Sequence, residues 1–245
     1  MAAVGEQALR PSRSLADCHH LLKIVLCSNR YHAIQALLIR YHDGYYTSHN
    51  ATLGPAVDFK VTRLQLDGHT VKVQNHLLHH PNQPGDRPAS FHYMYNGTTG
   101  LMFALDTTDE SATDRVRRWM QTDVQSAGRT ERGLSGVEGE AKTVERDPNI
   151  ARLLVATNVD AQNRVVSRAA GEALAAEFGV AYAETSAATG EGVREAFELM
   201  AAMANETWKA AEVRRNEVAA GRERGEQAHA QQPSTSATPS RCVVA

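Results

Sequence analysis

Histidine is the chemically reactive side chain that clusters most strongly in this sequence. Ten of the eleven histidines lie between residues 19 and 92. Imidazole is a common ligand of Zn²⁺ and other transition metals, so neighbouring histidines are candidate metal ligands. The candidates are His76, His79 and His80, with His19, His20 and Cys18 as further members. A pH-sensitive surface is an alternative, because histidine titrates near neutral pH, and a solvated loop without chemistry is another.

The last four residues carry a lipid-attachment pattern. Cys242-Val243-Val244-Ala245 matches the C-a-a-X box, and a final alanine favours a farnesyl group. One prenyl chain holds a protein on a bilayer only weakly, and a second cysteine or a purely basic segment is missing nearby. We therefore expect reversible attachment through Cys242 to the cytosolic face of an intracellular membrane.

Composition restricts the class of protein. The chain has 245 residues, a net charge of −2 and a pI near 6.6, which does not indicate a nucleic-acid-binding surface. Its three scattered cysteines predict a reducing compartment rather than a disulfide framework. We find neither a transmembrane stretch nor an apolar leader, and expect a cytoplasmic protein.

The first part of the chain predicts a strand, a helix and a hairpin. The apolar run 21–27 is typical of a strand buried on both faces. Side chains at helical spacing follow it: Ile34, Leu37, Leu38 and Tyr41. The next strand is expected over 57–66, with inward side chains at Val57, Phe59, Val61, Leu64 and Leu66. Asp67-Gly68 is a hairpin signal that returns the chain over 70–74.

The remaining pattern alternates strands and helices. Residues 75–95 are expected to be irregular, and strands are predicted at 101–105, 152–157 and 180–184. A helix with Val116, Trp119, Met120 and Val124 on one face follows the first of these strands. Ser167 and Gly179 are expected to cap a second helix, which carries Ala170, Leu174 and Phe178. A long final helix has one apolar stripe: Val193, Phe197, Met200, Ala204 and Trp208. This order predicts an α/β fold with a mostly parallel sheet.

Five segments, in chain order, resemble the Rab branch of the Ras-like small GTPases. They are 22–26 at the first strand, 52–59 at switch I with Pro55 and Ala56 as extra residues, 66–74 at the interswitch hairpin, 106–111, and Glu184-Thr185-Ser186-Ala187. The resemblance implies a Ras-like G domain, with a six-stranded, mostly parallel sheet flanked by helices. We expect it over 19–212 with a flexible insertion at 126–149, between disordered ends at 1–18 and 213–245.

The phosphate loop of this family needs G-x-x-x-x-G-K-[ST], whose glycines, lysine and hydroxyl hold phosphates and Mg²⁺. Aligned on the first strand, the two glycines become Ser28 and Ala33, the lysine becomes Ile34, and the hydroxyl becomes Gln35. All the chemical requirements are lost together. The cations left nearby are Arg30 and His32.

Of the other nucleotide contacts that the resemblance implies, some residues match the family and others do not. Thr52 and Gly54 match switch I, but the D-x-x-G-Q of switch II is replaced by residues 75–81, with Gln83 nearby. On the guanine side, the matching residues are Thr157, Asp160, Ser186 and Ala187, while Asn158 replaces a lysine. Weak GTP or GDP binding is expected, and Mg²⁺ binding is doubtful.

The sequence thus predicts a Rab-like pseudo-GTPase of vesicle and membrane traffic, with effectors or prenylation escorts as partners. Val57, Asp58 and Phe59 are the expected effector surface. Two alternatives remain: a divergent GTPase that still binds and hydrolyses GTP, and a metal- or pH-responsive binding module on the same fold.

Overall fold

The computed structural model describes residues 18–28, 30–46, 59–79, 97–126, 130–133, 142–145 and 149–230. The chain divides into two units, Met1–Trp208 and Lys209–Ala245. The first unit carries the sheet, and the second begins within the last helix.

A six-stranded sheet forms the centre of the first unit. Its strands are β1 (His20–Ser28), β2 (Phe59–Leu66), β3 (His69–His79), β4 (Gly100–Asp106), β7 (Ala151–Thr157) and β8 (Ala181–Glu184). Their order across the sheet is β2-β3-β1-β4-β7-β8. The hairpin β2–β3 is antiparallel and the other pairs are parallel. The predicted α/β fold with a mostly parallel sheet is confirmed.

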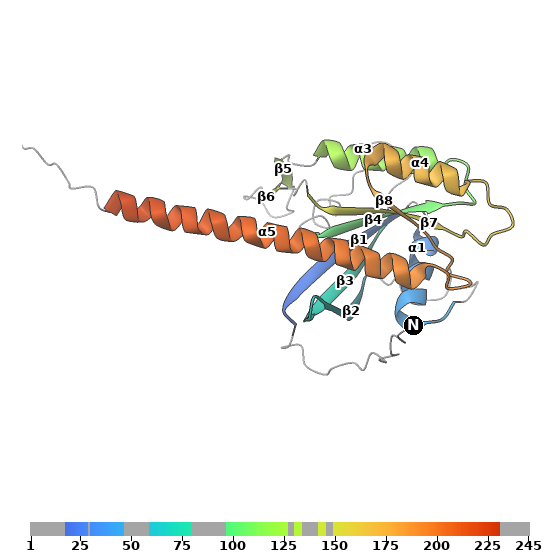
Figure 1. Ribbon diagram of the computed structural model, residues 1–245. Helices are drawn as coiled ribbons and strands as arrows, with labels where there is room; N and C mark the ends of the chain where they lie inside the picture. Colours follow the sequence, from blue (N-terminus) through green and yellow to red (C-terminus); the bar gives the residue numbers. More distant parts are fainter. Residues whose placement is uncertain are drawn as a thin grey trace, which may run out of the picture. The chain divides into compact units, whose positions relative to one another are not determined.

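Helices cover both faces of the sheet (Figure 1). The four described helices are α1 (Tyr31–Asp43), α3 (Ala112–Ser126), α4 (Arg168–Phe178) and α5 (Val193–Ala230). One core lies between the sheet and α1 with the first turns of α5, where the Tyr41 and Phe197 rings stack at 4.3 Å. The other core lies between the sheet and α3 with α4. Burying apolar side chains on both faces is what makes the central strands continuous hydrophobic runs.

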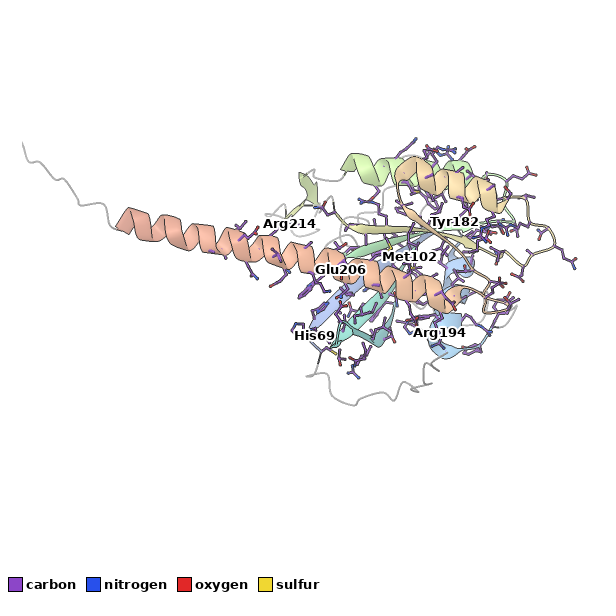
Figure 2. All side chains as sticks on the ribbon, in the orientation of Figure 1. His69, Met102, Tyr182, Arg194, Glu206 and Arg214 are labelled. Atoms are coloured by element: carbon purple, nitrogen blue, oxygen red, sulfur yellow. The ribbon has the colours of Figure 1, made fainter. Side chains whose placement is uncertain are left out.

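Helix α4 begins and ends at the residues that the sequence predicted. Ser167 Oγ accepts a hydrogen bond from Ala170 N at 3.2 Å, and Gly179 closes the helix with a φ of 63°. Gly171 faces Tyr182, since a Cβ there would lie 2.6 Å from the tyrosine ring. Tyr182 lies on β8 (Figure 2), so this glycine permits close contact between α4 and the edge strand.

The predicted inward face of β2 was wrong for two residues. Leu64 and Leu66 pack against the core, but Phe59 and Val61 are 49% and 42% exposed. Side chains of a regular strand alternate between its faces, so residues 59 and 61 cannot share a face with 64 and 66. Val57 lies outside the described residues.

Strand β3 is longer than predicted. Residues 75–79, which we expected to be irregular, extend the parallel pairing with β1 as far as Ser28↔His79. The prediction stopped too early because Asn75 and His76 break the apolar alternation. A polar residue in the strand keeps its backbone hydrogen bonds to both neighbours, so pairing continues through it.

The expected insertion and tail also contain regular structure. A two-stranded sheet, β5 (Thr130–Gly133) and β6 (Lys142–Glu145), lies within 126–149. Helix α5 continues to Ala230, past the predicted domain end at 212, because residues 213–230 are rich in alanine, glutamate and arginine, which favour helix. The domain bounds themselves stay predictions. None of the described helices is long and apolar enough to cross a bilayer.

Candidate functional site

The carboxyl ends of the parallel strands meet at one edge of the sheet. Ser28 ends β1, Asp106 ends β4, and Thr157 ends β7. Asp106 and Thr157 are directly paired across β4 and β7. In open α/β sheets, ligands bind outside this edge, at the loops that follow the strands. If the residues predicted to contact phosphate and guanine bind a nucleotide, they must do so at this edge.

The connection from β1 to α1 is very short. Only residues 29 and 30 separate Ser28, the last residue of β1, from the first residue of α1. Ser28 Oγ accepts a hydrogen bond from Arg30 N at 3.0 Å and donates one to Arg30 O at 3.2 Å. The hydroxyl therefore donates one hydrogen bond and accepts one within this turn. A phosphate loop instead needs a longer run of backbone N–H groups directed at one point.

The three other predicted phosphate positions lie in the first turns of α1. Ile34 is fully buried in the core between the sheet and α5, and Gln35 is also buried. Ala33 donates its N–H to Arg30 O at 3.1 Å, which closes the helix start. Ile34 therefore has a packing role here, and the position carries no ammonium group.

Arg30 lies at the N-terminus of α1 and faces two carboxylates. Its Nη1 is 3.3 Å from Asp106 Oδ2, and its Nε is 3.8 Å from Asp109 Oδ2. Asp109 also accepts hydrogen bonds from Ser111 N at 3.0 Å and Ser111 Oγ at 2.7 Å, and pairs with Arg115. Burial alone would raise the pKa of Asp109, but the Ser111 hydrogen bonds and the two cations lower it. The sequence suggested Arg30 as a cation without naming these partners.

Two loops at the guanine end of the edge lie together. Val159 N donates to Thr185 O at 3.4 Å, and Thr107 Oγ1 donates to the Thr157 and Asn158 carbonyls at 2.9 Å each. Asp160, in the same loop, is exposed. Its carboxylate is thus available for hydrogen-bond donors, as the resemblance requires of a guanine contact.

The second of these loops follows β8. Ser186 Oγ accepts a hydrogen bond from Thr189 N at 3.0 Å, and Ala187 is buried. Arg40 of α1 donates to Thr189 O at 3.1 Å, which ties the loop to the helix. The structure therefore places the loop of Thr157 and Asp160 beside the loop of Ser186 and Ala187, and gives each loop its own internal hydrogen bonds.

Several predicted residues lie outside the described part of the chain, among them Thr52, Gly54, Val57, Asp58, His80 and Cys242. Phe59, the described member of the expected effector surface, stacks on His76 at a ring distance of 5.2 Å. Among side chains that the structure describes, no group of three or more His, Cys, Asp and Glu could hold a metal ion.

An α/β sheet with a single antiparallel hairpin and ligand loops at its carboxyl edge is the architecture of nucleotide-binding G domains. The family model for the Ras family matches residues 23–206. The chain therefore belongs to the Ras family, and its relatives place it in the Rab branch.

Curated relatives agree with this family. Ras-related protein RAB1BV of Beta vulgaris is 32% identical over 193 residues, covering 78% of this chain and 79% of that protein. GTP-binding protein yptV2 of Volvox carteri is 33% identical over 184 residues, or 74% of each chain. Ras-related protein Rab-8B of Dictyostelium discoideum is 28% identical over 179 residues, covering 72% of this chain and 76% of that protein.

The family binds GTP or GDP with Mg²⁺, and the two ends of the site fit that ligand differently. At the guanine end, Asp160 is exposed and the two loops adjoin, so these residues fit a base. At the phosphate end, the Ile34 side chain is aliphatic and buried, and the Ser28 hydroxyl is engaged by Arg30. These residues do not fit a triphosphate with Mg²⁺, and we assign none of them to a hydrolytic step.

Proposed function

We propose that this chain is a Rab-type protein of intracellular membrane traffic that binds guanine nucleotides weakly and does not hydrolyse GTP efficiently. Rab relatives over most of the chain support the membrane-traffic role. The observation that carries the pseudo-GTPase proposal is the buried Ile34 at the position of the phosphate-binding lysine. Phosphoryl transfer depends on positioning and charge stabilisation, which an aliphatic side chain cannot supply.

The partners we propose are effectors or prenylation escorts of the Rab type. Phe59 is an exposed aromatic side chain on the edge strand β2, as a contact surface requires. Val57 and Asp58 complete the surface in the sequence-based proposal. A prenyl group on Cys242 would hold the protein reversibly on the cytosolic face of a membrane.

An active GTPase is the second candidate. Asp160 is exposed in a loop that adjoins the loop of Ser186 and Ala187, so the guanine end keeps part of the residue set that the resemblance assigns to it. Two curated relatives, yptV2 and ypt2, are named GTP-binding proteins. This candidate needs another group to replace the lysine and the Mg²⁺-binding hydroxyl.

Titration with fluorescent GDP and GTP, with and without Mg²⁺, separates the two candidates. We expect dissociation constants above about 10 μM and no effect of Mg²⁺, because base contacts alone give weak binding. Asp160→Ala should abolish whatever binding remains. Submicromolar affinity that depends on Mg²⁺, or GTP turnover that Asp160→Ala abolishes, would favour the active enzyme.

A further inference from the structure

Groups at the carboxyl ends of three strands, β1, β4 and β7, contact the carboxylate of Asp106. Asp106 Oδ1 accepts hydrogen bonds from Thr108 N at 3.0 Å, Thr108 Oγ1 at 2.7 Å and Asn158 Nδ2 at 3.0 Å. Its other oxygen, Oδ2, faces Arg30 at 3.3 Å. Asp106 thereby joins the start of α1, the loop after β4 and the loop after β7.

The burial of the two partners is unequal. The Asp106 side chain is 2% exposed, whereas the Arg30 side chain is 53% exposed. Moving a carboxylate out of water is costly unless a cation and hydrogen bonds compensate it. Among the cations that the structure describes, Arg30 is the one that pairs with Asp106. Arg30 is therefore the cation that faces this buried carboxylate.

Asn158 belongs to the same arrangement. It stands where the family has a lysine, and its backbone is left-handed, with a φ of 60°. Its side-chain amide donates to Asp106 Oδ1 rather than to the loop around Asp160. Arg30, which the sequence offered as a nearby cation, and Asn158, which replaces a lysine, thus contact the same side chain.

We propose that Arg30 closes this edge from within the chain, so that the domain stays folded with no nucleotide bound there. The inference rests on the proposed function, and deepens it by naming the internal contact that holds the strand ends together. A bound ligand stabilises a fold only while the ligand is present, whereas an ion pair within the chain is independent of ligand concentration. The closed edge would present one constant conformation to a partner.

The test uses full-length protein freed of nucleotide by EDTA treatment and desalting, with nucleotide content checked by chromatography of an acid extract. Arg30→Ala should lower the Tm by about 5 °C, because it leaves a buried carboxylate without its cation. Arg168→Ala is the matched control. Arg168 also begins a helix and faces two carboxylates, Glu172 at 2.8 Å and Glu184 at 3.8 Å, but both of these are more exposed than Asp106. The Tm of the Arg168→Ala variant should change by less than about 2 °C.

A rescue variant tests the cause. Asp106→Asn keeps an acceptor oxygen for Thr108 and Asn158 but removes the charge that needs Arg30. The double variant Arg30→Ala/Asp106→Asn should therefore recover at least about half of the lost Tm. If Arg30→Ala yields no soluble protein, the double variant should restore soluble expression. Failure of that rescue, or an Arg30→Ala Tm equal to that of Arg168→Ala, overturns the proposal.

Adding GDP with Mg²⁺ to the wild-type protein distinguishes this inference from the proposed function. If the nucleotide-free protein is folded and its Tm does not rise with GDP, both stand. A Tm that rises by several degrees, in a protein that is folded without nucleotide and still depends on Arg30, rejects weak binding but supports the internal closure. Loss of the cooperative transition on removing nucleotide overturns the closure.

Discussion

Gly192 lies where the loop after β8 enters α5, and its backbone geometry admits no side chain. Its φ is 66°, and a Cβ would lie 2.0 Å from the carbonyl oxygen of Glu184. Because that contact is to backbone, the loop carrying Ser186 and Ala187 would have to move.

We predict that Gly192→Ala lowers the free energy of unfolding by about 2–4 kcal/mol, measured by urea denaturation. Gly44→Ala is the control, since Gly44 has a similar φ of 74° with nothing within 4 Å of its Cβ. It should cost only about 1 kcal/mol. Equal losses in the two variants would contradict the contact with Glu184.

His42 sits at the end of α1 against β3. Its Nε2 lies 3.2 Å from Asn75 Nδ2, and only the neutral ring can accept that amide hydrogen. Burial lowers the pKa of His42 to about 4, with Lys60 acting in the same direction and Asp43 opposing it. The folded protein therefore disfavours protonation of His42 relative to the unfolded chain.

We predict that stability is lost as the pH falls from 6.5 towards 4. Above pH 6.5 both states are neutral, and below it the unfolded chain takes up the proton first. The loss should be about 1–2 kcal/mol, since the ring is only partly buried and solvent screens it. His42→Gln keeps an acceptor without titrating, so its unfolding free energy should fall less over this range. Parallel pH profiles for the two proteins would refute the assignment.

At the scale of elements, one ion pair holds α3 against the start of β7. Arg152 Nε lies 2.7 Å from Asp123 Oδ2, with the side chains 15% and 4% exposed. Arg152 Nη1 also donates to Ile150 O at 3.0 Å. These elements flank residues 126–149, so the pair fixes the two ends of the expected insertion.

We predict that Asp123→Ala costs about 3 kcal/mol in unfolding free energy, because it removes the carboxylate that faces a mostly buried guanidinium. The exposed pair Arg168–Glu172 on α4 provides the control, and Glu172→Ala should cost less than about 0.5 kcal/mol. Urea denaturation of both variants measures the difference. A small effect of Asp123→Ala would mean that water or another group solvates Arg152.

At the scale of the whole molecule, we predict lipid attachment at the C-terminus. Intact mass of the protein expressed in a eukaryotic host should show a prenyl adduct, because Cys242 lies in a C-a-a-X box. Cys242→Ser should remove the adduct and shift the protein from the membrane to the soluble fraction. Cys18→Ser, which changes another free cysteine, should leave both unchanged. A wild-type chain without a prenyl group would contradict this prediction.

Local patterns predicted most of the fold because they depend on neighbours in the chain. The buried strands, the amphipathic helices and the caps Ser167 and Gly179 follow from side-chain periodicity and backbone preference. The prediction was wrong for Phe59 and Val61, because it placed them on the same face of β2 as Leu64 and Leu66 although successive side chains of a strand alternate between faces. It also ended β3 too early at Asn75, where pairing with β1 decides the structure.

The sequence by itself determined the α/β class, the Rab resemblance and the loss of the phosphate-loop lysine. Only the tertiary structure decided what Arg30 does, because its partners Asp106 and Asp109 lie at the end of another strand and in the loop after it. Ion pairs between distant residues depend on sheet order, and β1 lies beside β4 through long-range pairing that no local pattern encodes. The burial of Ile34, in contrast, follows from its helical spacing with Leu37, Leu38 and Tyr41, and the structure places it in the core.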